Sequence, residues 1–89
     1  MFNIDELFKN EPTEEIIKML ATLKNAPGYP QMDRLFSSHG WPNTSSYELI
    51  LTYQRLLDTG VIQTETPLGR MRIGPNWTEP VFMTDKRYG

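Results

Sequence analysis

One stretch of the 89-residue sequence, residues 44–73, couples an amphipathic helix to a β-hairpin and constrains the fold more than any other. Ser45 and Glu48 fit a capping box, in which a hydroxyl and a carboxylate satisfy backbone donors at the start of a helix. The 3.6-residue period then predicts a helix over residues 46–58. Its predicted buried face comprises Leu49, Ile50, Tyr53, Leu56 and Leu57. Gly60 supplies the left-handed residue that commonly closes a helix.

The residues after this glycine have the composition of a hairpin. β-Branched residues over 61–66 predict a strand, Pro67-Leu68-Gly69 a turn, and the alternation over 70–73 a returning strand. Arg70 and Arg72 are two positions apart, so both arginines are expected on one outer face of the hairpin.

Three shorter helices are predicted upstream. An Asn cap and apolar spacing indicate a helix of about two turns around residues 3–8. A second helix is expected from about residue 12 through Lys24, burying Ile16, Ile17, Leu20 and Leu23. A third is expected from Pro30 to about Ser38, and the connection that follows contains Gly40, as in a helix-turn-helix.

The junction Leu56-Leu57-Asp58-Thr59-Gly60-Val61-Ile62 resembles the helix-to-strand junction of many winged-helix regulators. Val81-Phe82-Met83-Thr84 is similar to the returning wing strand of multiple-antibiotic-resistance and phenolic-acid type repressors, although the glycine that usually lies nearby comes late, at Gly89. The resemblance implies an α+β fold, mostly helical, with three or four helices and a two- or three-stranded antiparallel wing. The whole chain would be one domain, with a short N-terminal helix (1–10), a helical core (12–60), a wing (61–84) and a tail (85–89).

Composition argues against several functional classes. The sequence has no cysteine, which excludes disulfides and thiolate chemistry, and its one histidine, His39, lies beside a turn. The acid pairs Asp5-Glu6 and Glu14-Glu15 lie where carboxylates stabilise helix starts. We therefore expect no enzyme, cofactor or metal site. No apolar run approaches the roughly 18 residues of a membrane span, and the N-terminus lacks the basic start of a signal peptide, so we expect a cytoplasmic protein.

The first candidate partner is double-stranded DNA, bound by a transcriptional regulator whose 45–58 helix enters the major groove. The predicted contacts are Ser45 and Ser46 on phosphate, Thr52 and Arg55 on base edges, and Arg70 and Arg72 on the flanking backbone. Alternatively, Arg55 is a solvated side chain that pairs with Asp58 or Glu48.

The basic residues of the wing favour DNA, but the overall charge balance keeps open a second candidate, a protein partner. Nine basic and eleven acidic residues give a net charge of −2, whereas DNA-binding domains usually carry a basic excess; only residues 61–89 are net positive, with four basic and three acidic groups. The chain would then be an inhibitor, immunity factor or adaptor. The predicted interface residues are Phe2, Leu7 and Phe8, which are also candidates for a homodimer contact, together with Leu51 and Trp77.

Overall fold

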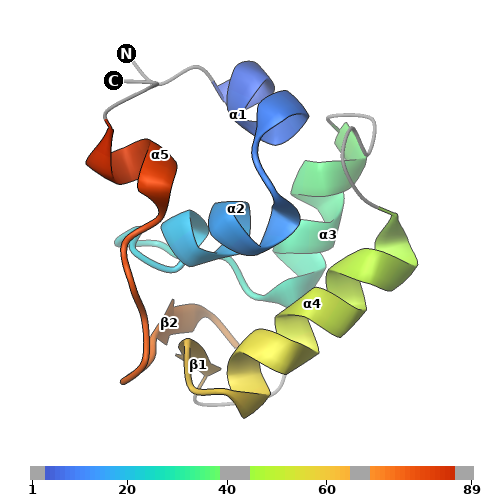
Figure 1. Ribbon diagram of the computed structural model, residues 1–89. Helices are drawn as coiled ribbons and strands as arrows, with labels where there is room; N and C mark the ends of the chain where they lie inside the picture. The colour runs from blue at the N-terminus through green and yellow to red at the C-terminus, as the bar shows by residue number, and fades with distance from the viewer. Residues whose placement is uncertain (1–3, 39–44, 65–68, 86–89) are drawn as a thin grey trace.

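The computed structural model describes residues 4–38, 45–64 and 69–85. It is mostly helical with one two-stranded antiparallel sheet, which confirms the predicted α+β class (Figure 1). The elements are α1 (Ile4–Asn10), α2 (Thr13–Leu20), α3 (Tyr29–Ser38), α4 (Ser46–Asp58), β1 (Ile62–Thr64), β2 (Met71–Ile73) and α5 (Val81–Thr84). Phe2, the predicted connection at residues 39–43 and most of the predicted hairpin turn lie outside the described residues.

Both ends of α4 form as the sequence predicts. The side-chain oxygen of Ser45 accepts a hydrogen bond of 3.2 Å from the backbone N–H of Glu48. At the other end, Gly60 has a φ of 77°. The N–H of Gly60 donates to the carbonyl oxygen of Leu57 at 3.2 Å, and the N–H of Val61 donates to the carbonyl oxygen of Leu56 at 3.0 Å. These two bonds make a Schellman motif, which needs a left-handed residue at the position that Gly60 occupies.

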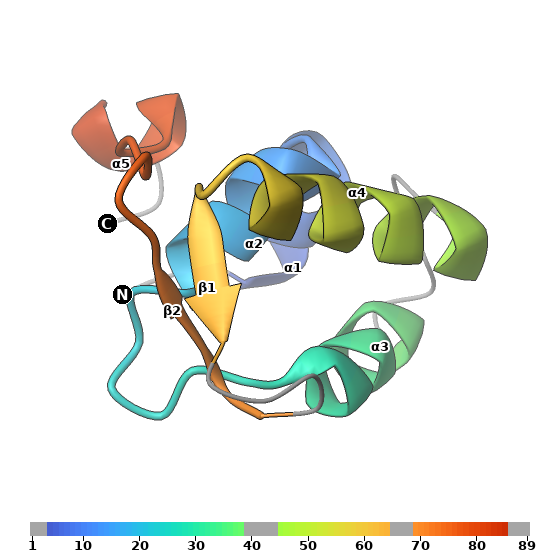
Figure 2. The same ribbon diagram turned by 90° about the horizontal axis from the view of Figure 1, so that it is seen from below.

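The hairpin pairs β1 with β2 in antiparallel register, with Gln63 opposite Arg72. A third extended segment touches the other edge of β2, because the N–H of Met71 donates to the carbonyl oxygen of Pro27 at 3.2 Å. Figure 2 shows this segment, between α2 and α3, running past β2 on the side away from β1. The small sheet is therefore flanked by α4 at one edge and by the 21–28 connection at the other.

The core lies among α1 to α4 and the inner side of the hairpin. α4 contacts α2, α3 and β1, and α1 packs on α2 (Figure 1). The side chains with the least exposure are Leu7, Phe8, Ile16, Ile17, Met32, Phe36, Leu49, Leu56, Ile62, Met71 and Phe82. Each buried aliphatic or aromatic side chain of this size stabilises the fold by about 1.5–3 kcal/mol relative to an exposed one.

The N-terminal helix closes this core with two residues that were predicted to contact a partner. Leu7 and Phe8 are fully buried, and the ring of Phe8 meets that of Phe36 edge-on with centroids 4.7 Å apart. Their apolar area is covered within the chain, so neither side chain is exposed to a partner in this structure. In a sequence, an apolar stripe on a short terminal helix is equally consistent with core packing and with an interface.

Two predicted core positions turn out to be exposed. α2 ends at Leu20, earlier than expected, and residues 21–25 form turns in which Thr22 donates from both its N–H and its hydroxyl to the carbonyl oxygen of Met19. The tighter turns rotate Leu23 off the buried stripe. On α4, Ile50 lies at the edge of the apolar arc and is also exposed.

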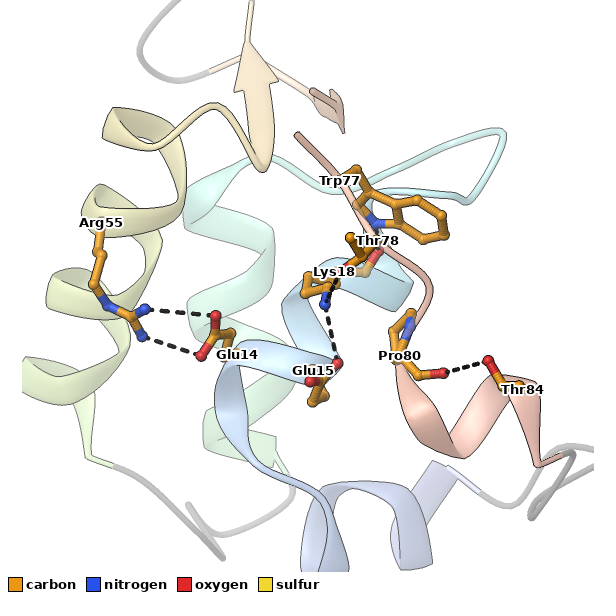
Figure 3. Close-up of polar contacts among 8 residues, drawn as sticks. All are labelled: Glu14, Glu15, Lys18, Arg55, Trp77, Thr78, Pro80 and Thr84. Atoms are coloured by element: carbon orange, nitrogen blue, oxygen red, sulfur yellow. Dashed lines mark hydrogen bonds and ion pairs between the residues drawn. The ribbon is translucent and has the colours of Figure 1, made fainter. Parts of the chain in front are cut away.

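Residues 81–84 form a single helical turn, α5, and not the predicted third strand. The carbonyl oxygen of Pro80 accepts the backbone N–H groups of Met83 and Thr84, and also the hydroxyl of Thr84 at 3.4 Å (Figure 3). The turn buries Phe82 in the core. Burial of one aromatic side chain thus outweighs the local strand preference of this segment.

The loop before α5 is anchored to α2 through polar contacts, shown in Figure 3. Trp77 donates its indole Nε1–H to the carbonyl oxygen of Lys18 at 3.0 Å, and Lys18 Nζ donates to Thr78 Oγ1 at 2.9 Å. The same ammonium group lies 3.4 Å from a carboxylate oxygen of Glu15. Trp77 is half-buried and its indole donor is satisfied within the chain, which leaves it less available to a partner than the sequence suggested.

Candidate functional site

The outer face of α4 carries an exposed apolar cluster. Tyr47, Ile50 and Leu51 are 71%, 46% and 52% exposed, whereas Leu49 and Leu56 on the opposite face are fully buried. The three exposed residues have i, i+3 and i+4 spacing, so they lie together on one side of the helix. We call them the α4 patch. The sequence identified Leu51 as exposed, and the structure adds its two neighbours.

Polar groups beside the α4 patch are mainly acidic. Glu48 and Asp58 are exposed on the same helix, and Gln54 lies between them with its amide donating to Asp58 Oδ1 at 3.2 Å. A helix that enters a DNA groove normally presents basic and amide groups to phosphates and base edges. The exposed face of α4 presents one basic and one amide side chain, Arg55 and Gln54, but also the carboxylates of Glu48 and Asp58.

Arg55, the predicted base-reading residue, forms an ion pair with another element. Its guanidinium donates to both carboxylate oxygens of Glu14 on α2, at 3.5 and 3.3 Å (Figure 3). The two side chains are about half exposed, at 56% and 42%. The predicted alternative placed the partner on α4 itself, and spacing within one helix could not have identified Glu14.

The remaining predicted contacts on α4 are engaged or partly covered. Ser45 uses its hydroxyl as the helix cap, and Ser46 Oγ donates to Asp33 Oδ1 at 3.4 Å. Thr52 is half-buried. Burial, followed by the charge of Asp33, raises the pKa of Tyr29 above its ordinary value. The side chain of Ser46 offsets part of this increase.

The two hairpin arginines lie at a different place, in a pocket of about 480 Å³ between the hairpin and the connection after α2. Arg70 and Arg72 are exposed there on the same side of the hairpin, as predicted, and Lys24 joins them from the connection. We call this the hairpin pocket. It is lined by residues 21–24, Ala26, Gln63 and residues 70–73.

The six predicted DNA contacts therefore fall into two groups. No residue of α4 lines the hairpin pocket, so Arg70 and Arg72 do not share a cavity with Arg55. The sequence analysis missed Lys24 because it placed this residue in the last turn of α2. The turn signal at Asn25-Ala26-Pro27-Gly28 was visible, but the sequence gives no indication that this turn lies against the hairpin.

The described part of the chain holds no group of three or more histidine, cysteine, aspartate or glutamate side chains placed to bind a metal ion. None of the helices in that part has the length and apolar character that crossing a membrane requires.

No family model matches the sequence, and neither the curated proteins nor the solved structures contain a match to it.

Proposed function

We propose that this chain is a winged-helix domain that binds another protein through the α4 patch. The order of elements supports the fold proposal, since α2, α3 and α4 are followed directly by the β1–β2 hairpin. The bond from the N–H of Met71 to the carbonyl oxygen of Pro27 adds support, because it holds the segment between α2 and α3 beside the two-stranded sheet. In this arrangement α4 is the second helix of the helix-turn-helix and the hairpin is the wing.

One observation carries the docking proposal: three large apolar side chains stay in solvent on the face of α4 opposite the core. Scattered exposed apolar residues are normal, but a cluster that combines an aromatic with two aliphatic residues is typical of the centre of an interface. Tyr47 in particular offers a large apolar ring with a polar tip, a combination enriched at binding hot spots.

The charge around the α4 patch defines the chemistry of the partner. Glu48 borders the patch, Asp58 lies about two turns further along α4, and Glu14 already balances Arg55. An acidic rim favours a partner whose apolar surface is bordered by lysine or arginine. It disfavours a second copy of this chain, because two identical acidic rims would face each other across a symmetric contact. The occupant is therefore a different protein with a basic-rimmed apolar surface.

A photoreactive amino acid placed at residue 51 tests this proposal by cross-linking in the cells that produce the protein. The matched control carries the same group at Val81, an apolar residue of α5 that is also exposed. We expect position 51, but not position 81, to cross-link one protein in stoichiometric yield. With the purified partner, Leu51→Ser should raise the Kd by about tenfold or more and Val81→Ser should leave it unchanged.

Three results would refute the docking proposal. They are equal cross-linking at both positions, an unchanged Kd for Leu51→Ser, and a concentration-dependent dimer of the isolated chain that Leu51→Ser abolishes. The last result would assign the α4 patch to a second copy. Circular dichroism of both serine variants controls for loss of the fold.

Duplex DNA is the second candidate partner, and the hairpin pocket is the observation that favours it. Arg70, Arg72 and Lys24 concentrate positive charge on one side of the hairpin, where a wing would meet the DNA backbone. In this case affinity for mixed-sequence duplex should fall steeply with salt and weaken in an Arg70→Ala, Arg72→Ala double variant. Arg34→Ala, which removes an exposed charge from α3, is the control. Absence of duplex binding at low salt would eliminate this candidate.

A further inference from the structure

The hairpin pocket has the volume of a small-molecule site. Its volume of about 480 Å³ is comparable to that of ligand clefts, which span roughly 300–1,000 Å³. Two separate parts of the chain form its walls, the connection after α2 and the outer side of the hairpin. In the hairpin wall, the side-chain amide of Gln63 donates to the carbonyl oxygen of Ile73 at 3.3 Å.

Among the described residues that line this pocket, the charged side chains are all basic. Lys24, Arg70 and Arg72 contribute three cations, and no aspartate or glutamate is among the described lining residues. This local excess occurs in a chain whose net charge is −2, so it does not reflect overall composition. Guanidinium groups present planar forks of donors that match the oxygens of a phosphate or carboxylate, and a lysine adds a compact positive charge.

Apolar groups lie among these cations. Leu23 and Ile73 line the pocket and are 48% and 46% exposed, although both are aliphatic residues that would normally be covered. Met71 contributes from the buried side of β2. A lone inorganic anion would leave these surfaces in water. A ligand that combines an anionic group with an apolar or aromatic body would cover both kinds of surface at once.

We propose that the hairpin pocket binds a small organic phosphate. The phosphate group lies against Arg70 and Lys24, and the apolar or aromatic body of the ligand covers Leu23 and Ile73. This site is separate from the α4 patch, so it does not depend on the proposed protein docking. The pocket volume of about 480 Å³ matches one compact ligand.

Phenyl phosphate is a suitable probe, because it joins one phosphate to one aromatic ring. We expect a titration of the ¹⁵N-labelled full chain at low ionic strength to shift the amides of residues 22–24 and 70–73. Inorganic phosphate should shift the same amides with weaker affinity, since it lacks the apolar body. Benzyl alcohol, which has the ring without the charge, should bind more weakly than phenyl phosphate because it makes no contact with the cations.

Substitutions separate the two halves of the site. Arg70→Gln should raise the Kd of phenyl phosphate by about tenfold, the loss expected for one charged hydrogen-bonding group. Leu23→Ser should weaken phenyl phosphate while leaving the affinity for inorganic phosphate unchanged. Arg34→Gln, which removes an exposed arginine outside the pocket, should alter neither affinity. Lys24→Gln provides a second charge variant in the exposed turn if Arg70→Gln disturbs the hairpin.

Several results would overturn this inference. One is the absence of shifts at residues 22–24 and 70–73 at millimolar phenyl phosphate; another is an equal loss of affinity in Arg34→Gln. A Leu23→Ser variant that binds phenyl phosphate as well as the wild type would show an adventitious ion site only. If a short duplex binds the same residues more tightly than phenyl phosphate and displaces it, the pocket belongs to a DNA interface. Cross-linking at position 51 is unaffected by any of these results.

Discussion

Gly74 and Gly60 meet backbone to backbone, so closely that a β-carbon on residue 74 would overlap the carbonyl oxygen of Gly60. Two backbone hydrogen bonds of 2.9 Å hold the segments at this distance. The N–H of Gly74 donates to the carbonyl oxygen of Val61, and the N–H of Asn76 donates to the carbonyl oxygen of Gly60. Asn76 Nδ2 also donates to the carbonyl oxygen of Thr59 at 2.7 Å. The end of α4 and the exit from the hairpin are thus held together, which fixes the wing relative to the helix.

Gly74→Ala should destabilise the protein by about 2 kcal/mol or more, because a methyl group at this position must displace backbone that is already hydrogen-bonded. Urea unfolding measures the change in the free energy of unfolding. Glu79→Ala, in the exposed part of the same loop, is the control and should change stability by less than about 0.5 kcal/mol. An alanine variant as stable as the wild type would mean that the two glycines are farther apart than described.

The Arg55–Glu14 pair should contribute little to stability despite its two contacts. Both side chains are about half exposed, so solvent screens their attraction. A double-mutant cycle of Arg55→Ala and Glu14→Ala should give a coupling of at most about 1 kcal/mol, which decreases as salt is added. The Gln54–Asp58 pair on α4, in which one partner is neutral, is the control and should respond less to salt. Coupling well above this value would show that the pair is effectively shielded from water.

Tyr53→Phe should leave stability unchanged or raise it by about 1 kcal/mol at neutral pH. The Tyr53 hydroxyl is buried and has no hydrogen-bond partner among the residues that the structure describes, so its removal relieves a desolvation cost while the ring is kept. Tyr29→Phe is the matched control, since the Tyr29 hydroxyl interacts with Ser46 and its ring lies 5.3 Å from that of Tyr53. We expect the control variant to be less stable than the wild type, as measured by urea unfolding.

The same two tyrosines predict a loss of stability at alkaline pH. Burial raises the pKa of Tyr53 above its ordinary value of 10.0, and burial together with Asp33 raises that of Tyr29. The folded state therefore binds these phenolic protons more tightly than the unfolded state does. Their contribution to the free energy of unfolding is fully present below about pH 10 and decreases as pH rises through the raised pKa values. Unfolding curves from pH 8 to 12 should show this decrease, and Tyr53→Phe should make it shallower.

Trp77→Phe should lower stability by about 1 kcal/mol, because the carbonyl oxygen of Lys18 loses its indole donor while most of the apolar contact remains. Trp77→Ala should cost more, since it also uncovers the apolar surface beneath the ring. Thermal unfolding followed by circular dichroism compares the three proteins. Equal stability of the phenylalanine variant and the wild type would show that the hydrogen bond contributes nothing to the anchoring of the loop.

Local sequence alone determined α4 and the class of the fold. The cap at Ser45 involves residues three positions apart, and the stop at Gly60 depends on one backbone conformation that glycine adopts without strain. The change to β-branched residues after Gly60 likewise predicted the hairpin and left only its boundaries to be refined. These features form within a few residues, so their determinants are contiguous in the sequence.

Only the tertiary structure decided which side chains face a partner. Leu7 and Phe8 are buried because α1 packs on α2, Arg55 is paired because α2 brings Glu14 beside α4, and residues 81–84 become helical because Phe82 enters the core. The hairpin pocket exists because Lys24 is brought beside arginines more than forty positions away. Each of these outcomes depends on contacts between distant segments, and no periodicity or spacing within a single element specifies them.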